Sequence, residues 1–266
     1  MSVPPVVRLL ADPVRWQLMR ELAAGDHRVR ELTAAVGQPQ NLVSYHLRQL
    51  RAAGLVTARR SSYDARDVYY QLDLDGCARA LAASASALHP ALQPGALQPG
   101  LALPPAAVPS AALAPGSATG HGPTRVLFVC TGNSGRSPMA AALLAHRADG
   151  AVEAASAGTR PKPLHPAAVA VMRDRYRIDI AGHRPTPVEE VAGEAFDYVI
   201  TLCDRARENC PGFAGHPGLI HWSLPDPAAA EGDQAGYPAF ERVAAELDTR
   251  IRFLLPVLRA DALAAG

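Results

Sequence analysis

The residues best suited to chemistry lie in the short stretch VCTGNSGRS. Cys130 comes near its start, and Arg136 follows after five intervening residues, two of which are glycines. Residues 125–130 are apolar and β-branched, and an alanine-rich run follows Ser137. We therefore predict a strand, a glycine-containing loop and a helix in that order, with Ser137 as the N-cap and Pro138 in the first helical position.

This loop is predicted to bind an oxyanion. The backbone N–H groups of such a loop point inward, and the dipole of the following helix adds positive potential. Both effects favour a thiolate at Cys130, and Arg136 offers paired donors to a tetrahedral anion. We predict that Cys130 is a nucleophile towards a phosphate-shaped substrate; the alternative is a tight turn with an incidental buried cysteine. The predicted oxyanion-binding residues are Thr131, Gly132, Asn133, Ser134, Gly135 and Ser137.

Asp226 is the candidate general acid. It lies between two prolines in HWSLPDPAAA, after the predicted strand LIHW, and the prolines restrict the shape of its loop. Attack on phosphorus or arsenic needs a proton for the leaving oxygen. An ordinary turn aspartate is the alternative.

Two more cysteines follow a separate predicted strand. Cys203 and Cys210 are seven residues apart in DYVITLCDRARENCPGF. Four unevenly placed cysteines make a disulfide framework improbable, and the sequence has no apolar run long enough to cross a bilayer. We therefore expect a cytoplasmic protein with no membrane partner, in which clustered thiols serve chemistry.

The region from Arg125 to about Leu258 resembles the low-molecular-weight tyrosine phosphatases on the motifs VCTGNSGRS and PDP. The resemblance implies an α/β fold with a small parallel sheet flanked by helices, and no metal. It also implies that Asn133 and Ser137 support the loop and the thiolate. A long last helix would cover the sheet with Phe240, Val243, Leu247, Ile251 and Leu254.

Within that family, DYVITLCDRARENCPGF and HWSLPDPA are similar to the thioredoxin-coupled arsenate reductases. The resemblance implies a thiol relay through Cys130, Cys203 and Cys210 that reduces arsenate to arsenite. It implies no bound cofactor and an external dithiol as reductant, either thioredoxin or another cellular thiol. Two unrelated buried thiols are the alternative. Gly135 and Ala141 depart from the family pattern, which often has a cysteine and an acidic residue at these positions.

Residues 1–88 have a different character. They carry a net charge of +3, against −2 for residues 124–266. Asp12 and Pro13 begin a predicted helix that Gly25 ends, and a second helix covers Val29–Val36. A third, near Asn41–Ala53, precedes a predicted hairpin, and a last helix spans about Leu74–Leu88. The order of these elements predicts a winged helix-turn-helix.

The motifs LADPVRWQLMREL, VSYHLRQLRAAGLV and RRSSYDARDVYYQL resemble the ArsR-type winged-helix repressors. The resemblance implies a homodimer that binds operator DNA, with the third helix in the major groove. A packing or dimerisation module is the alternative. We expect His27 and His46 to face solvent or DNA, and Cys77 to be a buried structural thiol. The predicted DNA-binding residues are Asn41, Ser44, Tyr45, His46, Arg48, Arg51, Arg59, Arg60 and Arg66.

Residues 89–123 contain no charged side chain and many prolines and glycines, so we predict a disordered linker between domains at 1–88 and 124–266. The sequence leaves three functions open. They are a combined repressor and arsenate reductase, a tyrosine phosphatase fused to a DNA-binding domain, and a regulator whose second domain only senses an oxyanion or the redox state.

Overall fold

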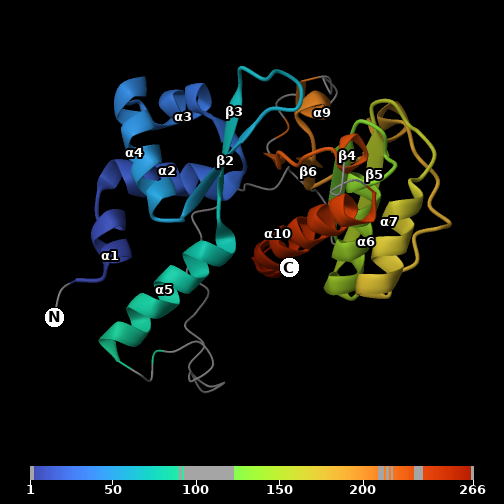
Figure 1. Ribbon diagram of the computed structural model, residues 1–266. Coiled ribbons are helices and arrows are strands. Elements are labelled where there is room, and N and C mark those ends of the chain that lie inside the picture. Colours follow the sequence, from blue (N-terminus) through green and yellow to red (C-terminus); the bar gives the residue numbers. More distant parts are fainter. Residues whose placement is uncertain are drawn as a thin grey trace. The chain divides into compact units, whose positions relative to one another are not determined.

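The computed structural model describes residues 3–89, 92, 123–208, 213, 216, 218–230 and 236–264. The chain forms an N-terminal unit that carries α1–α5 and a C-terminal unit that carries β4–α10, and we describe each by itself (Figure 1). The predicted linker, apart from residues 89, 92 and 123, lies outside the described residues, and so does Cys210. None of the helices described here is long and apolar enough to span a membrane.

The N-terminal unit consists of short helices and a small antiparallel sheet. The strand order is β1-β3-β2, and β1 pairs with β3 in a third strand that the sequence did not predict. Helix α1 was also unexpected. The elements are α1 (Pro5–Leu10), α2 (Pro13–Ala24), β1 (His27–Arg28), α3 (Val29–Val36), α4 (Gln40–Ala52), β2 (Val56–Arg60), β3 (Val68–Leu72) and α5 (Leu74–Leu88).

Local sequence explains where these helices begin and end. Asp12 Oδ1 accepts the backbone N–H groups of Val14 and Arg15 at 3.0 Å each, which caps α2. Gly37 ends α3 in the left-handed conformation, with φ of 66°. The helices pack through a core that is buried almost completely and consists of Leu18, Leu22, Leu32, Val36, Val43, Leu47, Leu50, Leu55 and Val56.

The C-terminal unit is built on a parallel sheet with strand order β5-β4-β6-β7. Its elements are β4 (Thr124–Cys130), α6 (Arg136–Ala148), β5 (Val152–Gly158), α7 (Pro166–Val171) with a π-helical turn at Met172–Tyr176, α8 (Val188–Val191), β6 (Tyr198–Thr201), α9 (Asp204–Glu208), β7 (Leu219–His221), a 3₁₀ turn at Pro227–Ala229 and α10 (Tyr237–Ala264).

The strand order fixes where a ligand can bind. After β4 the chain moves to β5 on one side and then returns across β4 to β6 on the other. The carboxyl ends of β4 and β6 therefore border the crevice at which α/β sheets bind ligands. Cys130 is the last residue of β4, and Cys203 comes two residues after β6. The topology brings two distant cysteines to one edge of the sheet.

Helix α10 packs against both α6 and α7, and the three helices complete the core of this unit. The predicted stripe on α10 is buried, with the side chains of Phe240, Val243, Leu247, Ile251 and Leu254 exposed by 6% or less. One local prediction was wrong. Helix α6 begins at Arg136 with Gly135 as its N-cap, so Ser137 lies inside the first turn.

Candidate functional site

The Cys130 sulfur lies in a cage of hydrogen-bonding groups at the end of β4. The backbone N–H of Asn133 donates to Cys130 Sγ at 3.2 Å, and Ser137 Oγ lies 3.0 Å from the same atom. Both groups stabilise a negative charge on sulfur when they donate to it. Cys130 is only 2% exposed, so its sulfur is surrounded by protein groups and little by water.

Asn133 holds the loop together from inside. It is completely buried and adopts a left-handed conformation, with φ of 45°. Its Nδ2 donates to Ser137 Oγ and to Ser156 Oγ, both at 2.9 Å. Its Oδ1 accepts the Thr186 N–H at 2.8 Å and lies 3.1 Å from His183 Nε2. The side chain thus joins the loop to β5 and to the segment before α8.

A neighbouring segment, residues 158–165, takes up the outward-facing carbonyls of the loop. The N–H groups of Arg160, Lys162 and His165 donate to the carbonyls of residues 131, 132 and 134, at 2.7, 2.9 and 2.8 Å respectively. Because these carbonyls are bound on the outer side, the loop can turn N–H groups towards the sulfur, as the Asn133 amide shows.

Side chains at two glycine positions of the loop would collide with neighbouring side chains. A Cβ on Gly132 would lie 2.8 Å from Ser134 Oγ, and one on Gly135 would lie 2.9 Å from Phe240 Cε1. Gly135 is the position at which the resemblance suggested that a cysteine often occurs. Here the ring of Phe240, which stacks on His165 with ring centres 4.4 Å apart, occupies that space.

Arg136 is the cation of the site and is 7% exposed. Its Nη1 donates to the carbonyls of Leu224 at 3.2 Å and Pro225 at 3.4 Å, which hold the guanidinium in place. Burial acts to lower the pKa of Arg136, but the negative charges of Cys203 and Cys130 raise it above its usual value. The guanidinium therefore stays charged despite its burial.

Cys203 lies next to the same loop. Its Sγ is 3.2 Å from Thr131 Oγ1, and it is 2% exposed. Burial raises the pKa of the Cys203 thiol, the Arg136 charge opposes that rise, and the charge of Cys130 adds to it. The two thiols and the guanidinium thus lie close enough to interact electrostatically. Cys77, Cys130 and Cys203 take part in no disulfide among the described residues.

Asp226 reaches the site from the loop after β7. Its Oδ1 lies 3.5 Å from Arg136 Nη2, and the carboxyl side chain is 47% exposed. Its Oδ1 also accepts the Ala228 N–H at 3.2 Å, so Asp226 caps the 3₁₀ turn that Pro227 begins. An exposed carboxyl group beside the site's cation can exchange protons with water.

In the N-terminal unit, the exposed side of α4 carries most of the predicted DNA-binding residues. Asn41, Tyr45, Arg48 and Arg51 are exposed, and Ser44 is partly exposed. In the part of the chain that the structure describes, neither the Arg48 nor the Arg51 guanidinium has a hydrogen-bond or ion-pair partner. Both cations are therefore available to an anionic ligand.

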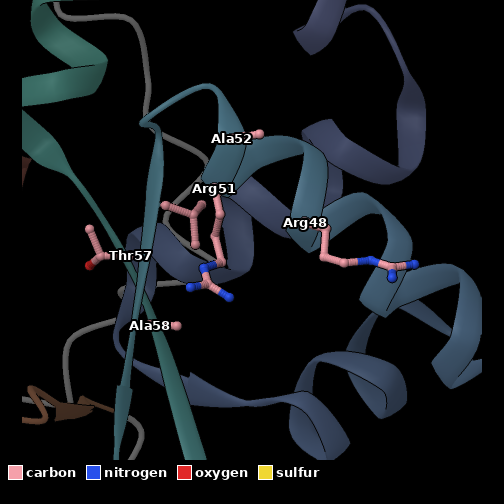
Figure 2. Close-up of a pocket in the computed structure, with 6 residues that line it drawn as sticks. Arg48, Arg51, Ala52, Thr57 and Ala58 are labelled. Carbon is pink, nitrogen blue, oxygen red and sulfur yellow. The ribbon is translucent and has the colours of Figure 1, made fainter.

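A hollow of about 500 Å³ lies between the C-terminal half of α4 and strand β2. Figure 2 shows the Arg51 side chain extending from α4 along this hollow, and Arg48, which also lines it, extending along the helix. Val56, Thr57 and Ala58 line the side formed by β2. Further along the hairpin, Arg60 and Arg66 are exposed and Arg59 is partly exposed.

His46 corrects a prediction. We expected this residue to face solvent or DNA, but it is 6% exposed. Its Nδ1 lies 3.9 Å from Asp12 Oδ1 and has no hydrogen-bond partner among the described residues. The reason is helical spacing, because position 46 falls on the same face as Val43, Leu47 and Leu50. His46 is therefore a core residue of this unit.

Two other side chains of the N-terminal unit bear on the sequence predictions. His27 is partly exposed, and its Nδ1 lies 4.0 Å from Glu31 Oε2. Cys77 is partly buried and its Sγ lies 3.4 Å from the Leu55 carbonyl. Burial, together with the charge of Asp73, raises the pKa of Cys77 to about 11, which keeps it a thiol at neutral pH.

Comparison with known proteins separates the two units. Residues 125–264, just over half of the chain, match the family of low molecular weight phosphotyrosine protein phosphatases. The chain belongs to this family. Residues 12–58 match the arsR family of bacterial regulatory proteins. The phosphatase-family unit thus follows an ArsR-type helix-turn-helix in one chain.

The relatives of the phosphatase-family unit include arsenate reductases. That of Shouchella clausii is 36% identical over 128 residues, which cover 48% of this chain and 91% of the relative. That of Bacillus licheniformis has the same identity and coverage. A solved arsenate reductase in a phosphate-binding state is 29% identical and covers 51% of this chain and 98% of its own, with a TM-score of 0.45. The C-terminal unit is of the arsenate reductase and phosphatase type.

Sequence reasoning missed three residues of this phosphatase-family site. Ser156, His183 and Thr186 contact Asn133 from other elements, and none of them has a distinctive spacing in the sequence. Their role follows only from the fold. Within the described ranges no group of three or more His, Cys, Asp or Glu side chains could hold a metal ion.

Proposed function

We propose that this protein is both a transcriptional regulator and an arsenate reductase. The observation that carries the enzymatic part is the buried Cys203, whose sulfur lies 3.2 Å from Thr131 Oγ1, in the loop that begins at Cys130. Hydrolysis of a phosphate ester needs one nucleophilic thiol, whereas reduction of arsenate needs two thiols that supply two electrons. The reductase names of the relatives support the same conclusion.

The first step is attack of the Cys130 thiolate on arsenic. The loop N–H groups and the Arg136 guanidinium bind the arsenate oxygens. Asp226 protonates the oxygen that leaves, which departs as water, and a Cys130–arsenic(V) bond remains. The N–H of Asn133 and the Ser137 hydroxyl, at 3.2 and 3.0 Å from the sulfur, favour the reactive thiolate.

The second step transfers the electrons. The Cys203 thiol attacks the Cys130 sulfur, so that a sulfur–sulfur bond forms and the sulfur–arsenic bond breaks, and the proton of Cys203 passes to an oxygen of the departing arsenite. The electron pair of the broken bond stays on arsenic, which leaves as arsenite. Cys210 then attacks Cys203 and releases Cys130, and an external dithiol, thioredoxin or another cellular thiol, reduces the Cys203–Cys210 disulfide. The protein itself needs no bound cofactor.

In the N-terminal unit, α4 binds operator DNA in the major groove. The exposed and unpaired Arg48 and Arg51 support this part of the proposal, since phosphate and base contacts both favour arginine. Tyr45, 47% exposed on the same helix, is a further contact. Exposed apolar side chains on α1 and α5, namely Val7, Leu81 and Leu88, fit a homodimer formed through this unit.

Turnover of arsenate by the full-length protein tests the enzymatic proposal. The assay follows NADPH consumption with thioredoxin and thioredoxin reductase. We expect the parent to turn over arsenate many times and Cys210→Ser to stop after about one turnover while it still hydrolyses a small aryl phosphate. Hydrolysis of the aryl phosphate with no reduction of arsenate by the parent would identify a tyrosine phosphatase instead. A parent with neither activity would fit a domain that only senses an oxyanion.

A further inference from the structure

Besides the contacts of Asn133, the C-terminal unit contains another buried polar network. Two of its residues flank Cys203 in the sequence. Ser223 Oγ donates to Asp204 Oδ1 at 2.6 Å, and His221 Nε2 lies 3.2 Å from the same oxygen. On the far side of the imidazole, His221 Nδ1 lies 2.9 Å from Thr201 Oγ1. Thr201 precedes Cys203 by two residues and Asp204 follows it directly. We call Thr201, Asp204, His221 and Ser223 the anchor.

The side chains of the anchor are almost completely buried. Asp204 and Ser223 are 0% exposed, Thr201 is 2% exposed and His221 is 5% exposed. A carboxyl group withdrawn from water is tolerated only when hydrogen bonds replace its hydration. Such a network therefore fixes the backbone positions of the residues that form it.

The anchor also stabilises helix α9, which follows Cys203. Helix α9 has only five residues, and a helix of that length is unstable without side-chain support. Thr201, at the end of β6, contacts His221, at the end of β7. Asp204, at the start of α9, contacts both His221 and Ser223. The residues before and after Cys203 are thus both fixed by hydrogen bonds. The Cys203 sulfur itself lies 3.2 Å from Thr131 Oγ1.

We propose that the anchor holds Cys203 in position for its attack on Cys130, and so sets the rate of the first disulfide step. A disulfide forms only within narrow limits of distance and dihedral angle, so a small drift of one thiol lowers the effective concentration of the pair steeply. In this step the Cys203–Cys130 bond forms, the Cys130–arsenic bond breaks and arsenic receives two electrons. The inference rests on the proposed reduction of arsenate. Hydrolysis of a phosphate ester needs Cys130 but not Cys203, so the two reactions can be compared in one variant.

Two substitutions in the full-length protein test this role. Ser223→Ala removes the donor at 2.6 Å from Asp204, and Thr201→Val removes the hydroxyl beside His221, while both leave the charge of Asp204 in place. A Cys210→Ser background stops the reaction after the first disulfide. Single-turnover release of arsenite and hydrolysis of a small aryl phosphate are then measured on the same sample. Equilibration of the Cys130–Cys203 disulfide with a dithiol buffer measures how easily this disulfide is reduced.

We expect each variant to release arsenite about tenfold more slowly, an effect of the size expected for the loss of one buried hydrogen bond. The disulfide should become easier to reduce, and aryl phosphate hydrolysis should stay within about twofold of the parent. Ser223→Thr, which keeps the hydroxyl, should release arsenite at the parent rate. Thr249→Val on α10, whose hydroxyl accepts only from Arg252 in the described part of the chain, is the matched control and should change neither reaction.

Equal losses in both reactions would show a general loosening of the unit and overturn the proposal. Unchanged arsenite release in both anchor variants would overturn it as well. A different result concerns the proposed function itself: if the Cys210→Ser parent, with its anchor intact, forms no Cys130–Cys203 disulfide when arsenate is added, the relay is wrong and the inference falls with it.

Discussion

Replacing Asn133 by alanine should damage both the stability and the activity of the phosphatase-family unit. The substitution removes the acceptor of the Thr186 N–H, at 2.8 Å, and the partner of His183 Nε2, at 3.1 Å. It also removes donors to Ser137 and Ser156, both at 2.9 Å, but hydroxyl groups can rotate towards other partners.

The size of the effect follows from these contacts. An N–H left without an acceptor costs about 1 kcal/mol when it is partly buried, as at Thr186 and His183. Alanine in the left-handed conformation, at φ of 45°, adds about 1 kcal/mol because it lacks the local hydrogen bonds by which a short polar side chain makes that conformation tolerable. We therefore expect the free energy of unfolding to fall by about 3 kcal/mol. The rate of aryl phosphate hydrolysis should fall about 100-fold, since the loop no longer aims its donors at the sulfur and the anion.

The assay can be confined to this unit because the chain has two tryptophans, Trp16 and Trp222, one in each unit. Trp16 is 54% exposed and Trp222 is 6% exposed, so Trp16→Phe should be neutral and leave Trp222 to report unfolding in urea. Asn133→Asp is the matched control. It keeps the acceptor oxygens and tolerates the left-handed conformation, so it should lose less stability than alanine, but its charge opposes the thiolate. An alanine variant within 1 kcal/mol of the parent that keeps a third of the activity would refute this reasoning.

Three further predictions concern other parts of the molecule. Cys130→Ser should abolish both arsenate reduction and aryl phosphate hydrolysis, and retained hydrolysis would remove Cys130 from its role as nucleophile. Arg51→Gln should weaken operator binding and reduce the slope of log affinity against log salt by about one, whereas Arg20→Gln on α2 should change neither. Gly135→Ala should destabilise the C-terminal unit by about 1 kcal/mol in urea unfolding, because the added Cβ would lie 2.9 Å from the Phe240 ring. The loss should be smaller in a Phe240→Leu background, and equal losses in both backgrounds would rule out this clash.

Most elements of both units could be predicted from local sequence. The helix predicted over Val29–Val36 has those bounds in the structure, and Gly37 stops it by adopting the left-handed conformation. The loop from Cys130 to Arg136 could be predicted because all its residues are consecutive, so a single strand-to-helix turn places thiol and guanidinium together.

Contacts between distant segments could not be predicted in this way. Thr186 and His183 reach Asn133 across 53 and 50 residues, and Ser223 reaches Asp204 across 19. No periodicity marks such residues, because only the strand order brings them together. His46 was misjudged for a different reason. Its polarity suggested exposure, whereas its helical position, three residues after Val43, decides its burial.

The central claim is that Cys203 is the second of the two thiols that together supply the two electrons for arsenate reduction, and Cys203→Ser tests this claim most directly. Arsenate turnover by the full-length variant is measured with thioredoxin, thioredoxin reductase and NADPH, and hydrolysis of a small aryl phosphate is measured on the same sample. We predict that arsenate turnover falls at least about 100-fold while hydrolysis stays within about threefold of the parent, because a serine hydroxyl cannot form the disulfide. Arsenate turnover at the parent rate would contradict the account.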